Sequence, residues 1–214
     1  AGLGLGFYLY HKIFRQIRMR RSAYCVAELR RETLNVLTIK LAVPQGKIFN
    51  YKPGQFVFMT PLSKNVRREE HPFSISSAPG NGQYITLTVK ELGDFTRQLK
   101  NLAAGDRILI DGPYGYFSFL NYPQRKHLVF LAGGVGITPL MSMLRFLHKT
   151  AKTQRISLIW GARNLKDLFW LDEIKSFQQD MPSFQFVPVL SEADPTWQGE
   201  RGFVTEDLLR RMVC

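Results

Sequence analysis

Cysteine is scarce in this sequence, and its scarcity excludes several kinds of site. Among 214 residues only Cys25 and Cys214 occur, and they lie far apart. A plant-type iron–sulfur cluster needs four thiolate ligands, so this chain cannot supply one by itself. Two distant cysteines also give no disulfide framework, which favours a reducing compartment. The four histidines show no metal-ligand spacing, and we expect no metal site.

A long apolar run is missing as well. Residues 1–10 are apolar, but they amount to half of the roughly 20 residues that cross a bilayer. Basic residues follow at Lys12, Arg15, Arg18, Arg20 and Arg21. This order is typical of a transmembrane helix that ends on its cytoplasmic side, and such a cluster attracts anionic lipid. We therefore expect residues 1–21 to be the membrane-proximal end of a transmembrane helix with a basic linker. An ordinary amphipathic helix is the alternative.

The overall balance of charge is strongly basic, with a net charge of +12. Nucleic acid binding would explain such an excess, but no base-stacking or groove-reading motif accompanies it, and we expect no nucleic acid partner. Hydrophobic residues make up 45% of the chain and aromatic residues 13%, which excludes a disordered chain. The length fits two domains of about 100 residues each.

Two different hydrophobic patterns meet near residue 122. Before it, short strands separated by turn residues predict an antiparallel β-barrel over residues 22–121, with strands at 23–30, 33–41, 55–60, 72–77, 83–90 and 107–111 and a helix near 94–102. After it, strands at 127–132, 155–160 and 184–190 alternate with helices at 137–149, 167–179 and 205–212. This alternation predicts a parallel α/β sheet over residues 122–214.

A glycine-rich turn stands between the apolar run 127–132 and the helix that follows it. Gly134 and Gly136 have no Cβ, so a phosphate can approach the backbone closely. The free N–H groups and the positive end of the helix would face that phosphate, and Pro139 suits the first helical turn. We expect a dinucleotide pyrophosphate here. A packing turn with no ligand is the alternative.

An aromatic and hydroxyl-rich strand precedes this turn by about sixty residues. Alternation places His71 and Phe73 on one face of the strand and Ser74 on the other. A flat ring and small hydroxyls on an extended backbone suit a flat heterocycle such as a flavin, although a plain barrel wall would have the same pattern. Gly93 to Thr96 then turn into a short helix, whose N-terminus offers a second phosphate site.

The order of five motifs resembles that of the ferredoxin-NADP reductase superfamily. The motifs are Tyr51 to Phe56, His71 to Pro79, Gly93 to Thr96, Gly112 to Phe117 and Gly134-x-Gly136-x-x-Pro139. The His-Pro-Phe-Ser form is similar to the cytoplasmic dehydrogenase domain of NADPH oxidases and ferric reductases. Members of the family continue beyond the last helix seen here, so the resemblance implies that the α/β domain is C-terminally incomplete.

The resemblance implies roles for two sets of residues. Phe73 would stack on the flavin ring and Ser74 would bond near its N5 atom, which makes these two the expected catalytic residues. The FAD site would consist of His71, Pro72, Phe73, Ser74, Lys90, Gly93, Phe95 and Thr96. The NAD(P)H site would consist of Gly112, Tyr114, Gly115, Gly134, Val135, Gly136, Ile137, Thr138, Pro139, Arg163 and Arg201.

His71 departs from the wider superfamily, in which many members carry arginine at this position. The arginine fork grips phosphate at two points, and imidazole cannot reproduce that geometry. We therefore expect FAD to be bound non-covalently and to dissociate on dilution.

The choice of nicotinamide depends on the residues just after the strand 155–160. An NAD-selective site usually places an acidic residue there to bind the ribose hydroxyl. This chain has Arg163 instead, and the oxidase family uses arginine at the matching position for the 2′-phosphate. We expect NADPH, with NADH possible through Asp167. A solvated loop charge is the alternative explanation of Arg163.

Together these features predict a flavin-dependent oxidoreductase module. Hydride would pass from NAD(P)H to FAD, and single electrons would pass to the haem of a transmembrane domain of the same polypeptide, at the cytoplasmic face of the cell membrane. The product would be superoxide, peroxide or ferrous iron. A soluble NAD(P)H flavin reductase, or an electron-transfer subunit for a separate protein, is the alternative. A non-catalytic flavin-binding module remains the third.

Overall fold

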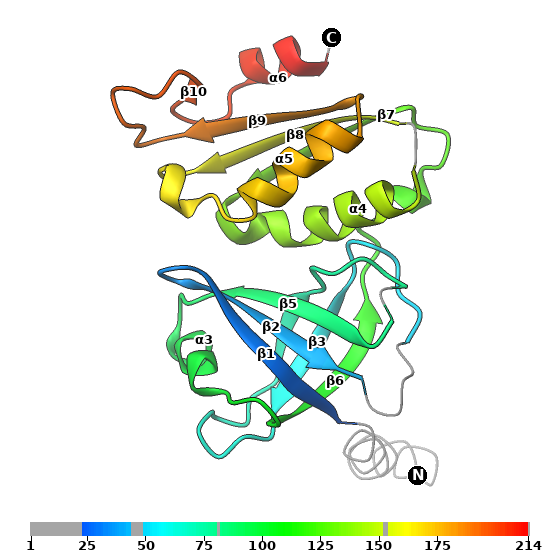
Figure 1. The fold of residues 1–214 in the computed structure, drawn as a ribbon, viewed down its shortest axis with the longest axis vertical. Coiled ribbons are helices and arrows are strands. Elements are labelled where there is room, and N and C mark those ends of the chain that lie inside the picture. The colour runs from blue at the N-terminus through cyan, green and yellow to red at the C-terminus, as the bar shows by residue number, and fades with distance from the viewer. Residues whose placement is uncertain (1–22, 44–48, 81, 152–153, 214) are drawn as a thin grey trace, which may run out of the picture.

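The computed structural model describes residues 23–43, 49–80, 82–151 and 154–213. Figure 1 shows two domains stacked along the long axis, with a β-barrel at the N-terminal end and an α/β domain at the C-terminal end. The expected fold class, an antiparallel barrel followed by a parallel α/β sheet, is confirmed. The expectation for residues 1–21 lies outside the described residues.

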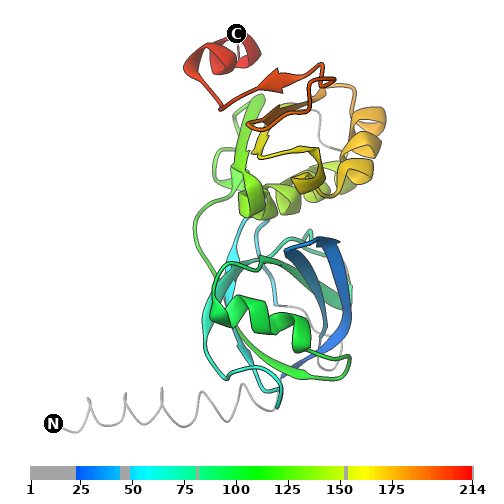
Figure 2. The same cartoon turned by 90° about the vertical axis from the view of Figure 1, so that its left-hand side faces the viewer.

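The barrel is one six-stranded antiparallel sheet in the order β4-β3-β6-β1-β2-β5. Its strands are β1 (Tyr24–Thr33), β2 (Val36–Ala42), β3 (Phe56–Pro61), β4 (His71–Ser74), β5 (Tyr84–Lys90) and β6 (Arg107–Tyr114). Alternate residues of β3, such as Val57 and Met59, are fully buried, as expected for a strand with one face in the core. The helix α3 (Asp94–Gln98) packs on the barrel through the buried Phe95, as Figure 2 shows from the side.

The barrel closes where the chain leaves β4. The sequence predicts one strand over 72–77, but β4 ends at Ser74 because the backbone changes partner there. The amide of Ile75 still donates to the carbonyl of Gln55 beside β3, at 3.0 Å, whereas the amide of Ser76 donates to Thr86 of β5, at 2.9 Å. A bridge between Ile75 and Leu87 completes the closure.

The second domain is a four-stranded parallel sheet in the order β10-β9-β8-β7. Its strands are β7 (His127–Gly133), β8 (Arg155–Ala162), β9 (Phe184–Leu190) and the short β10 (Glu200–Arg201). The helices α4 (Thr138–Lys149) and α5 (Leu171–Asp180) cover one face, and α6 (Glu206–Val213) packs on the other through Leu208. Burial on both faces explains why four of the five residues 156–160 in β8 are apolar, with only Ser157 polar among them.

Helix α5 begins later than the expected residue 167. Residues Leu165–Asp167 form a separate single turn, and Trp170 has a left-handed backbone with φ of +62°. A tryptophan rarely adopts this conformation, and it interrupts the helical path just before Leu171.

Gly54, which belongs to the family motif Tyr51 to Phe56, allows close packing between the domains. Its φ is +97°, and a Cβ there would lie 2.1 Å from the carbonyl oxygen of Phe117 and 2.3 Å from the methyl group of Met143. Only glycine allows this approach between the barrel, the linker and α4.

Candidate functional site

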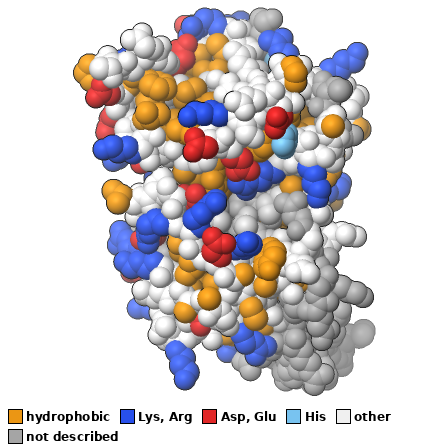
Figure 3. All heavy atoms as spheres, in the orientation of Figure 1, with side chains coloured by type: hydrophobic (Ala, Val, Ile, Leu, Met, Phe, Trp, Pro, Cys, Tyr) orange, Lys and Arg blue, Asp and Glu red, His pale blue; other side chains and the backbone are white. Residues whose placement is uncertain are grey.

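A cleft of about 710 Å³ lies between the barrel and the carboxyl edge of the parallel sheet. This is the size of an ordinary ligand pocket, and such edges are where α/β sheets bind ligands. The barrel contributes Thr33, Asn35, Val36, Lys90 and Leu92; the α/β domain contributes Leu131, Ala132, Gly133, Gly134, Val135, Gly161, Ala162, Arg163, Asp167, Phe169, Ser191, Gly202, Phe203 and Val204. Figure 3 shows charged side chains of both signs on this face of the molecule, including at the waist between the domains.

The glycine turn after β7 leaves open space at the cleft. A Cβ built at Gly133, Gly134 or Gly136 would meet no atom within 4 Å. Gly134 has φ of +48°, and its carbonyl accepts a 2.9 Å hydrogen bond from the buried indole of Trp160. The turn continues directly into α4, and no side chain caps the start of this helical turn, Gly134–Ile137, so the N–H groups at the start of the turn can face an anion. The turn therefore fits a pyrophosphate.

The other residues expected around this turn contribute backbone more than side chain. Ile137 is fully buried and Thr138 is 6% exposed, so both side chains belong to the core under the turn. Val135 lines the cleft. Pro139 stands in the first helical turn, as expected.

The structure separates the two arginines expected to bind the nucleotide. Arg163 follows β8, lines the cleft, and has a 70% exposed side chain whose Nε lies 3.5 Å from Glu192. Arg201 instead lines a different cavity. Its guanidinium donates to the carbonyls of Asp194, Pro195 and Trp197, at 2.9, 3.0 and 2.8 Å. Arg201 therefore does not line the cleft that holds Arg163, and its expected contact with NAD(P)H stays a prediction.

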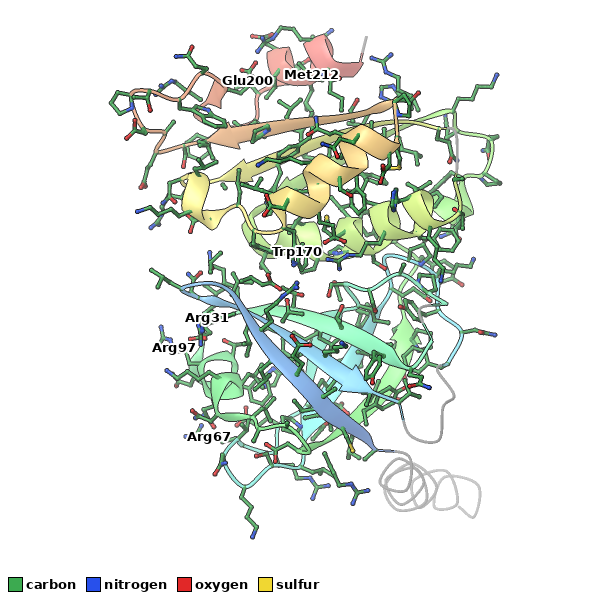
Figure 4. All side chains as sticks on the ribbon, viewed as in Figure 1. Arg31, Arg67, Arg97, Trp170, Glu200 and Met212 are labelled. Atoms are coloured by element: carbon green, nitrogen blue, oxygen red, sulfur yellow. The ribbon has the colours of Figure 1, made fainter. Side chains whose placement is uncertain are left out.

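The expected flavin residues are brought together by β4 and α3. The ring of His71 stacks on that of Phe95 with centroids 4.0 Å apart, and its Nε2 lies 3.2 Å from Glu69. Phe73 is opposite Val57 and packs against the barrel core while remaining partly exposed. Ser74 is opposite Phe56. Figure 4 shows Arg97 on α3 and Arg67 below it, farther from the α/β domain.

Thr96 shapes the loop that precedes α3. Its hydroxyl accepts from the amides of Leu92 and Gly93, each at 3.0 Å, and donates to the carbonyl of Gly93 at 3.0 Å. No side chain caps the first turn of α3. These bonds fix the amides of Leu92 and Gly93 in the loop before α3. Lys90, at the end of β5 just before this loop, also lines the interdomain cleft.

The segment around Tyr114 does not lie in the cleft with Gly134. Tyr114 and Gly115 line a separate hollow of about 600 Å³ on the barrel, where Gln55 donates to the carbonyl of Gly115 at 2.9 Å. A Cβ on Gly112 would lie 2.9 Å from Cγ1 of Val57, so packing on β3 accounts for this glycine. Their expected contact with NAD(P)H stays a prediction.

Two features of the cleft were missed by the sequence reasoning. Phe203 is 82% exposed at the cleft although it is a large aromatic residue; Gly202, with φ of +84°, turns the chain just before it. The hairpin between β1 and β2 also reaches the cleft through Asn35, and Arg31 holds that hairpin by donating to Leu34 and Glu91, each at 2.8 Å. The only local sequence feature that could have indicated Phe203 is the glycine directly before it, Gly202.

Comparison with known families accounts for both domains. Residues 23–118 match the FAD-binding domain model, and residues 130–214 match the oxidoreductase NAD-binding domain model. The chain belongs to the ferredoxin-NADP reductase superfamily. Its two domains are therefore those of an FAD-containing NAD(P)H oxidoreductase.

Similar curated proteins are reductase parts of oxygenases. The glycine betaine monooxygenase reductase subunit of Chromohalobacter salexigens is 32% identical over 91% of this chain and 54% of its own length. The propane 2-monooxygenase reductase component of Rhodococcus jostii is 32% identical over 84% and 50%. The phenol 2-monooxygenase reductase component of a Pseudomonas species is 34% identical over 80% and 48%. This chain spans about half the length of these relatives.

Solved structures share the fold. A cytochrome P450 reductase from Amycolatopsis superimposes with a TM-score of 0.77 at 24% identity, covering 89% of this chain and 57% of the other. A ferredoxin NADP⁺ reductase from Neisseria gonorrhoeae, solved with FAD and NADP, gives 0.75 at 22% identity over 89% and 76%.

These relatives overturn two expectations. The transmembrane haem domain of the same polypeptide and the location at the cell membrane, with anionic lipid at residues 12–21, are wrong: the relatives are named as reductase subunits and components of oxygenases. An apolar stretch followed by basic residues also fits an ordinary amphipathic helix, so this pattern could not decide between the two. In the part of the chain that the structure describes, no helix is long and apolar enough to span a bilayer.

Proposed function

We propose that this chain is the reductase module of a multicomponent oxygenase, which takes hydride from NAD(P)H onto FAD and passes electrons to a separate redox protein. The observation that carries the proposal is the cleft shared by Lys90 of the barrel and by Gly134 and Arg163 of the α/β domain. The similarity to oxygenase reductase components supports the separate acceptor. When bound, FAD accepts electrons as a pair and can release them singly.

Different residues of the α/β domain would bind different parts of NAD(P)H. The open glycine turn and the start of α4 would hold the pyrophosphate of NAD(P)H. Arg163, next to Ser191 in the cleft, would bind the 2′-phosphate of NADPH, and the exposed face of Phe203 would contact the adenine. Adenine stacking on an aromatic ring is worth about 1–3 kcal/mol in comparable stacks.

On the barrel, Phe73 and Ser74 would contact the flavin ring, and the loop shaped by Thr96 would face the FAD phosphates. The expected positions fit this role, because Phe73 keeps part of its ring exposed at the barrel surface. His71, stacked on Phe95, lies beside the same helix. An imidazole cannot bind phosphate through two parallel N–H donors as a guanidinium does. We therefore expect FAD to be bound weakly.

The decisive experiment measures electron flow in the purified protein supplied with FAD. NADPH and NADH are each mixed with it anaerobically, flavin bleaching is followed, and cytochrome c is then added as an artificial one-electron acceptor. We expect bleaching followed by cytochrome reduction. A protein that binds FAD but is bleached by neither nucleotide would contradict the proposal.

Cofactor preference is tested with Arg163→Ala. We expect wild type to prefer NADPH and the variant to lose about 1.5–3 kcal/mol of that preference, roughly ten- to 150-fold in kcat/KM, because a charge-assisted phosphate contact disappears. Arg155→Ala is the matched control, since Arg155 stands at the opposite end of the same strand. An unchanged ratio in Arg163→Ala would remove this residue from the site.

A further inference from the structure

One face of α4 is bonded to the barrel segment that follows β4. Three side chains at helical spacing donate to three backbone carbonyls of residues 76–80: Ser142 to Ser77 at 2.6 Å, Arg145 to Ser76 at 2.5 Å, and Lys149 to Gly80 at 2.6 Å. We call these three residues the α4 stripe. All three acceptors are backbone carbonyls. The α4 stripe therefore holds the backbone of residues 76–80 in place independently of the side chains of that segment.

Arg145 is the most constrained member of the α4 stripe. Its Nε and Nη2 donate to the two carboxylate oxygens of Glu173, both at 2.7 Å, which leaves Nη1 for Ser76. The guanidinium also lies over the ring of Trp170, 4.5 Å from its centroid, and the side chain is only 16% exposed. A bidentate pair of this kind fixes direction as well as distance. Figure 4 shows Trp170 at the junction of the two domains.

The segment and the helix that Arg145 connects are continuous with the two cofactor sites. Residues 76–80 begin two positions after Ser74, and α4 begins two positions after Gly136. Any shift between the segment and α4 would therefore move the flavin strand relative to the glycine turn. Arg145 touches neither expected site itself.

We propose that Arg145 is a positioning residue for hydride transfer: it sets the register between the flavin strand and the nicotinamide helix. This inference rests on the proposed function. Reaction rate depends steeply on such alignment, since a misplacement of about 1 Å can cost up to a hundredfold. Most residues assigned to each cofactor lie in a single domain, although barrel residues such as Lys90 also line the cleft, so binding should be less sensitive to the register than the reaction rate is.

The test compares Arg145→Met with Arg210→Met in the full chain supplied with FAD. Arg210 is a matched control because its guanidinium also pairs with a carboxylate, that of Glu206 at 2.6 Å, but within the single helix α6. Four quantities are measured: the dissociation constants of FAD and of NADPH, the rate of flavin bleaching at saturating NADPH, the long-wavelength charge-transfer absorbance, and amide exchange of residues 76–80 without cofactors.

We expect Arg145→Met to slow flavin bleaching roughly 10- to 100-fold and to weaken the charge-transfer absorbance, with both dissociation constants within about threefold of wild type. Amide exchange of residues 76–80 should quicken before any cofactor is added. Ser142→Ala, which removes a second bond of the α4 stripe, should act in the same direction and less strongly. Arg210→Met should leave all four quantities unchanged.

A bleaching rate equal to wild type in a folded Arg145→Met protein would overturn the inference. So would a rate that falls only in proportion to lost FAD, because Arg145 would then merely stabilise the fold. If Arg145→Met does not fold, Ser142→Ala carries the same decision. A wild type that binds FAD and is never bleached would instead defeat the proposed function.

Discussion

At the residue scale, the glycine turn makes a size series informative. Gly136 has room for a Cβ in the protein itself, so a larger side chain there should collide with a ligand and leave the fold intact. We expect Gly136→Ala to raise KM for NADPH moderately and Gly136→Val to abolish flavin bleaching, while the dissociation constant of FAD stays the same. Titration of both cofactors and a thermal melt check this.

Gly136 is a better site for this series than Gly134. The φ of +48° at Gly134 would strain any L side chain there, so lost activity would not distinguish strain from a blocked phosphate. Unaltered NADPH binding in Gly136→Val would exclude the turn as the pyrophosphate site.

Substitutions of Phe73 and Phe203 should each weaken the binding of a different cofactor. Phe73 lies on the barrel beside the expected flavin, and Phe203 lies at the cleft in the α/β domain. We expect Phe73→Ala to weaken FAD by about 1–3 kcal/mol and to spare NADPH, and Phe203→Ala to do the reverse. Equilibrium titrations of each variant with each cofactor decide it. Two variants that weaken the same cofactor would contradict the assignment.

At the scale of elements, the contact between β8 and the turn after β7 supports the proposed nucleotide site from beneath. The buried indole of Trp160 donates to the carbonyl of Gly134 and packs edge-on against Phe169. We expect Trp160→Phe to lower the free energy of unfolding by about 1–3 kcal/mol, because the part-buried carbonyl of Gly134 loses its partner and a small cavity forms where the indole was buried. NADPH binding should weaken as well. Urea unfolding and NADPH titration measure the two effects.

Trp197→Phe is the control for that substitution. Trp197 also donates from its indole to a carbonyl, that of Glu200 at 3.1 Å, but it lies away from the glycine turn. Its replacement should leave NADPH binding unchanged. An equal loss of NADPH binding in both variants would mean that general loosening of the domain is responsible.

At the scale of the whole molecule, two buried tyrosines should limit stability in alkali. Burial raises the pKa of Tyr24 and of Tyr51 to about 12, from an ordinary 10.0; repulsion from Tyr51 adds to the shift at Tyr24, and a hydrogen bond with Ser77 opposes it at Tyr51. Because the folded state holds these protons more tightly, the stabilisation is complete below pH 10 and is lost as the pH rises from about 10 to about 12.

We therefore expect the free energy of unfolding to fall over that interval by up to about 2–3 kcal/mol for each tyrosine. Tyr51→Phe should make the fall smaller, although it also removes a hydrogen bond and lowers the starting stability. Tyr116→Phe, at a 92% exposed position, should not alter the fall. Urea unfolding across this pH range tests it, and identical slopes in wild type and Tyr51→Phe would contradict the prediction.

The sequence alone determined the order of the main strands and helices. It also located the glycine turn at Gly134 and the aromatic and hydroxyl-rich strand at His71, because each of these patterns lies within a few consecutive residues. Side-chain periodicity follows from local backbone geometry, so β7 and α4 were predicted within a residue or two of their bounds. The turn at Gly134 belongs to the same class of local signal. Strand β4 ended early only because its closure partner, Thr86, lies elsewhere in the chain.

The tertiary structure decided which of these residues meet in space. Arg163 and Arg201 both follow strands of the parallel sheet or belong to one, yet of the two only Arg163 lines the cleft, because folding places four backbone carbonyls around the guanidinium of Arg201. Phe203 reaches the same cleft, and Arg145 joins two cofactor segments nearly seventy positions apart. Such contacts depend on how the two sheets and their helices pack, and packing brings together residues between which local sequence patterns carry no information.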